Sequence, residues 1–220
     1  MQKKLLIKFA SRSRYAKMLK CLDNIIEMAV GDFHILLSLD ADDTTIDKVE
    51  LSDIINSHGN MTVVYGSSKS KVHAINRDIN LISYDWDVLF NMSDDMVITQ
   101  YGFDKLILDE FNDFDGLLHL PDGFANDKLV TLSIMSRNYY KRFGYIYHPA
   151  YFSLWCDNEQ TDVAKLLNQY KYVDKRFFYH DHPNNTGVGL DLQYKHTESF
   201  YTIDGNTYHE RKALRFNLPV

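Results

Sequence analysis

The chain has 220 residues, of which 45% are hydrophobic and 14% aromatic, which is enough apolar side chain for one substantial core. Its formal net charge of −6 at pH 7 disfavours nucleic acid as a main partner, because the molecule as a whole repels polyanions. An anionic ligand must therefore be met by a local basic patch or by a bound cation. We expect a single domain spanning residues 1–220.

The two cysteines and the apolar runs indicate the compartment. Cys21 and Cys156 lie far apart and form no CxxC pair, which is typical of a reducing intracellular environment. No apolar run approaches the roughly 20 residues needed to cross a bilayer, so no transmembrane segment is expected. The N-terminal stretch MQKKLLIKFA is followed by SRSR and not by a small-residue cleavage site. We therefore expect a cytoplasmic protein.

In the first half of the chain, short apolar runs alternate with amphipathic segments, which predicts a repeating order of strand and helix. The expected strands cover 5–10, 33–39, 61–66 and 86–92, and the expected helices cover 15–28, 44–59 and 70–83. Strands that alternate with helices of this length form βαβ crossovers. The sequence therefore predicts an α/β fold with a mainly parallel central sheet that carries helices on both faces.

The second half is less regular. Its expected helices cover 103–111, 137–144 and 159–170, and its expected strands cover 115–120, 129–135 and 170–183. The stretch NNTGVG (184–189) has no periodicity and contains two glycines, which is typical of a mobile loop. The remaining tail to residue 220 has weak helical character.

A polar cluster follows each of the first four expected strands. In chain order these clusters are SRSR, DADD, SSKSK and SDD. The carboxyl ends of parallel strands meet at one edge of the sheet, which is where open α/β sheets bind ligands. We therefore predict a nucleotide-type site at this edge. Its basic residues could meet phosphates, although surface arginines and lysines are also often merely solvated; they are Arg12, Arg14, Lys69 and Lys71.

Two aspartates, Asp94 and Asp95, come directly after the fourth expected strand. Mg²⁺ and Mn²⁺ take carboxylate oxygens together with substrate phosphate oxygens, so this pair could hold a divalent cation. The alternative is that Asp94 caps a following helix. His180 and His182 alternate along an expected strand and so point to one side of it, where one of them could complete a Mn²⁺ site or both could be ordinary packing residues.

Asp157 and Glu159 lie where the helix of residues 159–170 is expected to begin. Carboxylates are stabilised at a helix start, so capping explains them in structural terms. A carboxylate in a cleft beside apolar residues can also act as a general base that takes the proton of an attacking hydroxyl. The two roles are compatible, because a helix start holds a base rigidly.

Taken in order, these segments resemble the GT-A-type glycosyltransferases, particularly those of the family 2 kind. The resemblance covers about residues 4–183 and rests on SRSR, SLDADD, GSSKSKVHAINRDI, NMSDDM and WCDNEQTDVAKLL. It implies the nucleotide-diphospho-sugar transferase fold. It further implies a nucleotide-binding half in residues 1–100, an acceptor and catalytic half in 101–183, and a loop and tail in 184–220.

The resemblance also implies roles for individual residues. SDD corresponds to the DxD-type motif that binds ribose and the metal–diphosphate, and Asp40 or Asp42 would contact the base. The nucleotide-sugar-binding set it implies is Ser11, Arg12, Arg14, Asp40, Asp42, Lys69, Asn76 and Asp94. The metal, Mn²⁺ or Mg²⁺, would be held by Asp95 together with His180 or His182.

One position departs from the family pattern. The motif whose acid serves as base in inverting members resembles Glu159–Asp162, but Gln160 stands where the family has aspartate. Either Glu159 or Asp157 then serves as base, or the enzyme is not inverting, or it is inactive.

The function expected from the resemblance is hexosyl transfer from a nucleotide-sugar donor, with a UDP-sugar as first candidate, to a glycan or other hydroxyl acceptor. A sugar-phosphate nucleotidyltransferase is one alternative, but it would need a glycine-rich phosphate loop, and FASRSRYAK has no glycine. The other alternative is a degenerate module that binds a nucleotide or glycan without turnover, which Gln160 keeps open.

Overall fold

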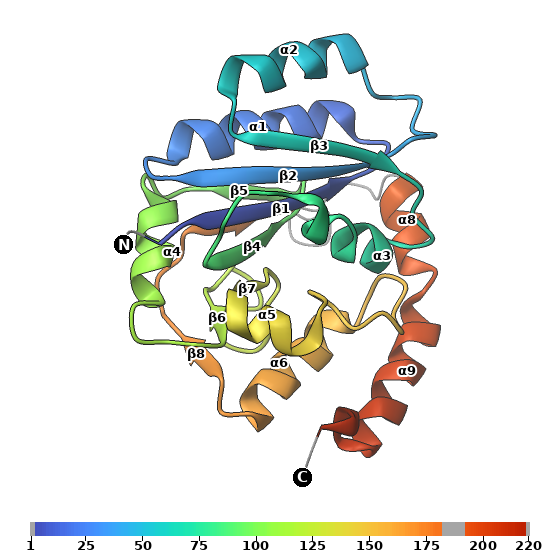
Figure 1. Cartoon of the computed structure of the whole chain (residues 1–220). Helices are drawn as coiled ribbons and strands as arrows, with labels where there is room; N and C mark the ends of the chain where they lie inside the picture. The colour runs from blue at the N-terminus through green and yellow to red at the C-terminus, as the bar shows by residue number, and fades with distance from the viewer. Residues whose placement is uncertain (1–2, 182–191, 219–220) are drawn as a thin grey trace.

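The computed structural model describes residues 3–181 and 192–218 of the chain. His182 and the expected loop at 184–189 lie outside the described residues. A seven-stranded sheet with the order β3-β2-β1-β4-β7-β6-β8 forms the centre of the molecule (Figure 1). Its strands are β1 (Leu5–Ser11), β2 (Phe33–Asp40), β3 (Met61–Gly66), β4 (Val88–Met92), β6 (Leu117–His119), β7 (Ile134–Ser136) and β8 (Tyr170–Tyr172).

The strand directions agree with the predicted α/β fold. Strand β1 pairs in parallel with β2 and β4, and β2 pairs in parallel with β3, so the carboxyl ends of the first four strands share one edge. Strand β7 lies antiparallel between β4 and β6, and β8 is parallel to β6. The sheet is therefore mainly parallel, with one antiparallel strand inside it.

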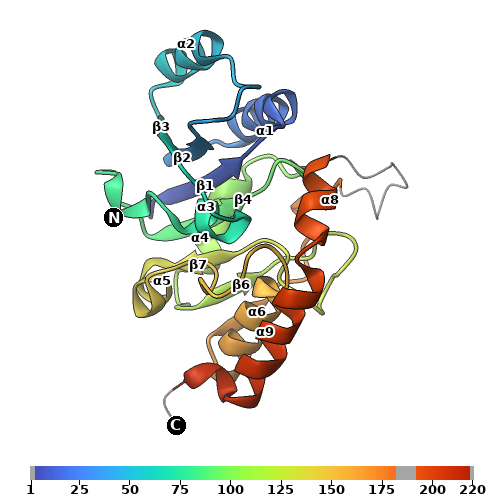
Figure 2. The same ribbon diagram turned by 90° about the vertical axis from the view of Figure 1, so that its right-hand side faces the viewer.

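Helices cover both faces of the sheet. Figures 1 and 2 show α1 and α2 on one side and α5, α6 and α9 on the other. The helices are α1 (Tyr15–Met28), α2 (Lys48–His58), α3 (Lys71–Asn76), α4 (Phe103–Glu110), α5 (Arg137–Phe143), α6 (Cys156–Leu166), α8 (Leu192–Glu198) and α9 (Tyr201–Ala213), with 3₁₀ turns η1 (Ile79–Leu81) and η2 (Arg215–Asn217).

The alternation of side chains along β1 divides the core into two clusters. Leu5, Ile7 and Phe9 are fully buried against α1, α2 and α4, whereas Leu6 packs in the cluster that includes α3, α5, α6 and α9. Successive residues of a strand point to opposite faces, so a strand covered on both sides reads as a continuous apolar run. This explains why LLIKFA lacks the alternation of a half-exposed strand.

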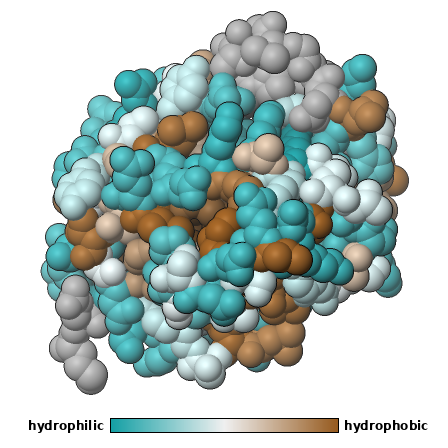
Figure 3. Space-filling view, turned by 90° about the horizontal axis from the view of Figure 1, so that it is seen from above, coloured by the Kyte–Doolittle hydropathy of each residue, from teal (hydrophilic) through white to brown (hydrophobic). Residues whose placement is uncertain are grey.

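The face formed by α1 and α2 is mixed in character. Figure 3 shows hydrophobic residues in a broken band near its centre, bordered by hydrophilic side chains. Leu19, Ile26, Ile54 and Ile55 are partly buried against the core beneath, and Val49 is exposed. None of the helices in residues 3–181 and 192–218 has the length and apolar character that crossing a bilayer requires.

The structure differs from the sequence prediction in three segments. The helix expected over 70–83 stops at Asn76, because Arg77 is extended and Asp78 adopts the left-handed conformation at φ 76°. Both side chains turn to the sheet edge, where Arg77 Nη2 donates to the Leu39 carbonyl (2.6 Å) and Asp78 Oδ2 accepts from Ser38 (2.6 Å). Of the strand expected over 129–135, only its end enters the sheet, as β7.

The third difference matters most for the site. The strand expected over 170–183 is two strands in different sheets, β8 and β9 (Phe178–His180). Strand β9 pairs antiparallel with β5 (Met96–Ile98), a three-residue strand too short for periodicity to reveal. Met96 lies opposite His180 in this register, so the pairing brings His180 beside the Asp94–Asp95 pair.

Lys8 is a charged residue at the centre of β1, and it is fully buried. Its ammonium donates to the Ser38 hydroxyl, which in turn donates to Asp78 Oδ2. Burial lowers the pKa of Lys8 from 10.5 to about 7, although the nearby Asp78 carboxylate opposes the change. The folded state therefore binds this proton more weakly than the unfolded state does.

The pH dependence of stability tests this burial. Between about pH 7 and pH 10, the unfolded chain keeps the Lys8 proton and the folded chain loses it, so rising pH favours folding of the wild type. Relative to Lys8→Met, the wild-type free energy of unfolding should rise by up to about 1.4 kcal/mol per pH unit in this window. Urea unfolding of both proteins at pH 7, 8 and 9 measures the difference. Parallel pH curves for the two proteins would show that Lys8 keeps an ordinary pKa.

Candidate functional site

The polar clusters predicted from the sequence meet at the carboxyl edge of the parallel strands. At the end of β1, Ser11 Oγ donates to Asp94 Oδ2 (2.8 Å). Arg12 Nη1 donates to Asp40 Oδ2 (2.6 Å), and its guanidinium also bonds both carboxylate oxygens of Asp42 (2.7 and 2.9 Å). The arginines and aspartates predicted from separate strand ends are thus direct neighbours.

Asp94 is held by two donors from the segment after β1. In addition to the Ser11 bond, Arg14 Nη1 lies 3.0 Å from Asp94 Oδ1. Only 7% of the Asp94 side chain is exposed, and this burial raises its pKa against the opposing charge of Arg14. The element that begins directly after this pair is the strand β5, and the next helix, α4, begins only at Phe103. Helix capping therefore does not explain Asp94.

Asp95 is the second buried carboxylate of the pair, with 9% of its side chain exposed. Its Oδ1 accepts from Ser93 Oγ (2.5 Å), and its Oδ2 accepts from the Tyr194 hydroxyl (2.9 Å). His180 Nε2 lies 3.6 Å from the same Oδ2. Burial alone would raise the pKa of Asp95, but His180 outweighs it and holds the pKa well below its usual range.

His180 stands between two carboxylates. Its Nδ1 lies 3.4 Å from Asp122 Oδ2, on the opposite side of the ring from Asp95. Burial alone would lower the pKa of His180. The hydrogen bonds with Asp122 and Asp95 have the larger effect, so the pKa is raised from 6.5 to about 9. Asp122 is itself fixed by the backbone amides of Phe124 (2.9 Å) and Ala125 (2.8 Å), so the imidazole has a rigid support.

Asp95 and His180 are the residues here that suit a divalent cation. The described residues contain no group of three or more His, Cys, Asp or Glu side chains arranged to hold a metal ion. They do contain a carboxylate oxygen of Asp95 and an imidazole nitrogen of His180 that face each other at 3.6 Å. Cations of the Mg²⁺ and Mn²⁺ kind are commonly bound by one or two protein ligands plus substrate phosphates, and imidazole suits Mn²⁺. The pair therefore fits a two-ligand site that a diphosphate would complete, in which the His180 imidazole loses its proton as the cation binds.

The two candidate bases at the start of α6 have different surroundings. Asp157 is partly buried, and burial raises its pKa while the positive charges of Lys71 and His180 oppose the rise. Glu159 is buried, and it accepts two bonds from Arg211 (2.6 and 2.8 Å) and one from the Tyr151 hydroxyl (2.7 Å). Asp157 thus shares the electrostatic environment of His180, whereas Glu159 is engaged in an ion pair with α9.

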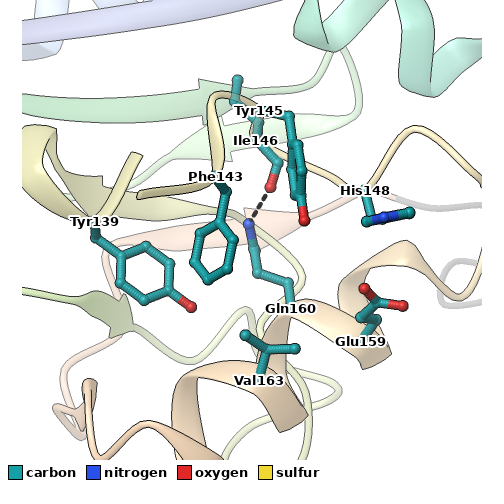
Figure 4. Close-up of a pocket in the computed structure, with 8 residues that line it drawn as sticks. All are labelled: Tyr139, Phe143, Tyr145, Ile146, His148, Glu159, Gln160 and Val163. Carbon is teal, nitrogen blue, oxygen red and sulfur yellow. Dashed lines mark hydrogen bonds between the residues drawn. The ribbon is translucent and has the colours of Figure 1, made fainter. Parts of the chain in front are cut away.

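Glu159 and Gln160 both face a pocket between α5 and α6. Half of the side chains that line the pocket are aromatic rings, and Figure 4 shows Gln160 pointing toward the loop that follows α5. There Gln160 Nε2 donates to the Ile146 carbonyl (2.6 Å). The lining residues are Tyr139, Phe143, Tyr145, Ile146, His148, Glu159, Gln160 and Val163.

Two further residues of the predicted nucleotide-sugar-binding set, Asn76 and Lys69, make contacts away from the acidic pair. The Asn76 side chain bonds to the protein backbone: its Nδ2 donates to the Tyr147 carbonyl (2.6 Å), and its Oδ1 accepts from the amides of Ile146 and Tyr147 (2.9 and 3.0 Å). It therefore anchors the loop after α5. Lys69 is exposed, and its backbone amide bonds to His73 Nδ1 (3.1 Å).

Several residues at the site carry no recognisable sequence signal. Asp122, in LPDGF, reads as an ordinary turn residue, and Tyr194 lies in the tail whose fold could not be predicted. On α9, Asp204 is fully buried and accepts from the backbone amides of residues 152, 153 and 154 (2.9, 2.8 and 2.8 Å). Together with Arg211, Asp204 fastens α9 to the loop and helix that carry Asp157.

Neither a protein-family model nor a curated protein sequence matches the chain. Solved structures are similar to it at low identity. The mannosyltransferase PcManGT from Pyrobaculum calidifontis, in complex with GDP-Man and Mn²⁺, matches with a TM-score of 0.60 and 13% identity over 80% of this chain. TarS 1–349 from S. aureus matches with 0.61 and 14% over 80% of this chain in complex with UDP-GlcNAc, and with 0.63 and 13% over 99% in complex with UDP.

The chain is shorter than these structures. It spans 55% of the mannosyltransferase, and 58% and 76% of TarS in the two complexes. Sheet order, helix layers and these matches agree on the architecture. The chain has the GT-A glycosyltransferase fold, as its sequence resemblance predicted.

Proposed function

We propose that the chain is a metal-dependent glycosyltransferase that moves a sugar from a nucleotide-sugar donor to a hydroxyl acceptor. The observation that carries the proposal is the buried Asp94–Asp95 pair at the end of β4, with His180 Nε2 3.6 Å from Asp95. The fold supports it, because structures of this fold are known in complex with GDP-Man and Mn²⁺, with UDP-GlcNAc and with UDP.

The donor would lie along the carboxyl edge of the sheet. Asp95 and His180 would hold Mn²⁺ or Mg²⁺, which when bound neutralises the negative charge of the diphosphate. Arg14 and Lys71 bring positive charge to the same region and can meet phosphate oxygens. Arg12, Asp40 and Asp42, which are joined at the end of β2, are the groups we assign to the nucleoside. A UDP-sugar is the first candidate donor.

We assign the general base to Asp157. Its raised pKa favours acceptance of a proton, and it interacts with the charges of Lys71 and His180 beside the donor site. Asp157 would take the proton of the acceptor hydroxyl as that oxygen attacks the anomeric carbon. The bond from this carbon to the diphosphate oxygen then breaks, and its electron pair leaves with the nucleoside diphosphate. A base on the acceptor side corresponds to inversion at the anomeric carbon.

We assign a structural role to Glu159, the other candidate base. Its carboxylate is already bonded by Arg211 and Tyr151, so it is poorly placed to accept a proton from an acceptor. Breaking a buried ion pair by removing one partner leaves an uncompensated charge, which is strongly destabilising.

Nucleotide binding provides the first test. Wild type should gain several degrees in melting temperature with Mn²⁺ and one of UDP, GDP or their sugars, because a ligand that binds only the folded state stabilises it. Asp95→Asn should lose the Mn²⁺-dependent part of this shift. The control is Asp53→Asn, an exposed carboxylate on α2, which should behave as wild type. A shift that is equal with and without Mn²⁺, or that survives in Asp95→Asn, would contradict the metal assignment.

Separate effects on turnover and stability test the base. Asp157→Asn should lower the rate of nucleoside diphosphate release by roughly 10²- to 10⁴-fold, the usual contribution of a general base, while the nucleotide affinity stays within a few fold of wild type. Glu159→Gln should instead lower the free energy of unfolding by about 3–5 kcal/mol. If Glu159→Gln abolishes turnover at unchanged stability and Asp157→Asn stays active, the base is Glu159. Nucleotide binding by a wild type that never releases product would indicate a degenerate binding module.

A further inference from the structure

Helix α8, in the C-terminal part of the chain, lies over the acidic pair. Figures 1 and 2 show it beside the sheet, at the side toward which β2 and β3 point. Tyr194 is buried, with 5% of its surface exposed, whereas Leu192 on the same helix is 84% exposed. Tyr194 is thus the residue through which α8 packs into the protein.

Tyr194 contacts both halves of the acidic site. Its hydroxyl donates to Asp95 Oδ2 (2.9 Å), and its ring lies under the guanidinium of Arg14, 3.8 Å from ring centroid to Cζ. The ammonium of Lys17 lies 5.5 Å from the same ring centroid. Arg14 is also the ion-pair partner of Asp94. The Tyr194 side chain therefore joins α8 both to the Asp95 carboxylate and to the Arg14 guanidinium.

These contacts leave little room at the two aspartates, whose side chains are 7% and 9% exposed. The proposed donor would need the same groups: a cation would approach Asp95, and the diphosphate would approach Arg14. A hydrogen bond from a hydroxyl to a carboxylate and an arginine–aromatic contact are each modest in strength, so a ligand can replace them. Both contacts of Tyr194 therefore compete with the donor.

We propose that Tyr194 is a latch that holds α8 over the acidic pair, and that the cation and nucleoside diphosphate must displace it to bind. The inference rests on the proposed function, since it assigns the competing ligand. It makes α8 a built-in competitor of the donor: the closed site is the state without ligand, and donor binding releases the helix.

Binding of Mn²⁺ alone, and then of Mn²⁺ with UDP, tests the latch by calorimetric titration. Tyr194→Phe keeps the ring over Arg14 but loses the hydroxyl, so it should bind Mn²⁺ roughly threefold to tenfold more tightly than wild type. Tyr194→Ala loses both contacts and should bind Mn²⁺ with UDP more tightly still. Tyr201→Phe, an exposed tyrosine at the start of α9, is the matched control and should bind as wild type.

Hydrogen exchange of the amides in α8 gives a readout that does not depend on affinity. The latch predicts that Mn²⁺ with UDP speeds amide hydrogen exchange over residues 192–198 in the wild type. It also predicts that Tyr194→Phe exchanges these amides fast even without ligand. Equal or weaker Mn²⁺ binding by Tyr194→Phe, or slower exchange of α8 on ligand binding, would overturn the latch while leaving the proposed function intact. If wild type and all three variants bind neither Mn²⁺ nor UDP, the proposed function fails and the latch fails with it.

Discussion

The contact on which the candidate site depends is the placement of His180 between two carboxylates, Asp95 and Asp122. Asp95 belongs to the end of a parallel strand, and Asp122 to a turn after β6, so nothing local in the chain brings them together. The short antiparallel pair of β5 and β9 does, because its register sets His180 opposite Met96, the residue after Asp95. Without that pairing, His180 would not lie beside the acidic pair.

Asp122 gives this arrangement rigidity. It accepts two backbone amide bonds and the Thr131 hydroxyl (3.0 Å), so its carboxylate cannot turn away from His180. A carboxylate that orients a histidine from behind is a recurring support of metal-binding imidazoles.

Helix geometry places the two acids of α6, Asp157 and Glu159, in different surroundings. Residues two apart on a helix point about 200° apart, so Asp157 can face the donor edge while Glu159 faces Arg211 on α9.

The sequence predicts the first half of this fold well, because its strands and helices are long and strongly periodic. The expected helix over 15–28 coincides with α1, and the strand at 61–66 coincides with β3. The later elements are three-residue strands, which offer no period to detect, and the segment over 170–183 divides between two sheets. The helix over 70–83 breaks because Arg77 and Asp78 form polar contacts at the sheet edge, which propensity alone does not anticipate.

The site follows the same division. Ser11, Arg12, Arg14, Asp40 and Asp94 could be predicted to lie at one edge because parallel strand ends share it. The structure bonds Ser11 and Arg14 to Asp94, and Arg12 to Asp40. Asp122 and Tyr194 could not, because they come from a turn and from the tail, and only tertiary packing brings them to Asp95. The opposite roles we propose for Asp157 and Glu159 likewise depend on α9, whose position the sequence did not predict.

The most direct measurement of the central claim is a crystal structure of the protein grown with Mn²⁺ and UDP, with anomalous diffraction used to locate the manganese. The account predicts an anomalous peak within about 2.5 Å of both an Asp95 carboxylate oxygen and the His180 Nε2 atom. A manganese peak away from these two residues, or a bound nucleotide with no metal beside Asp95, would contradict it.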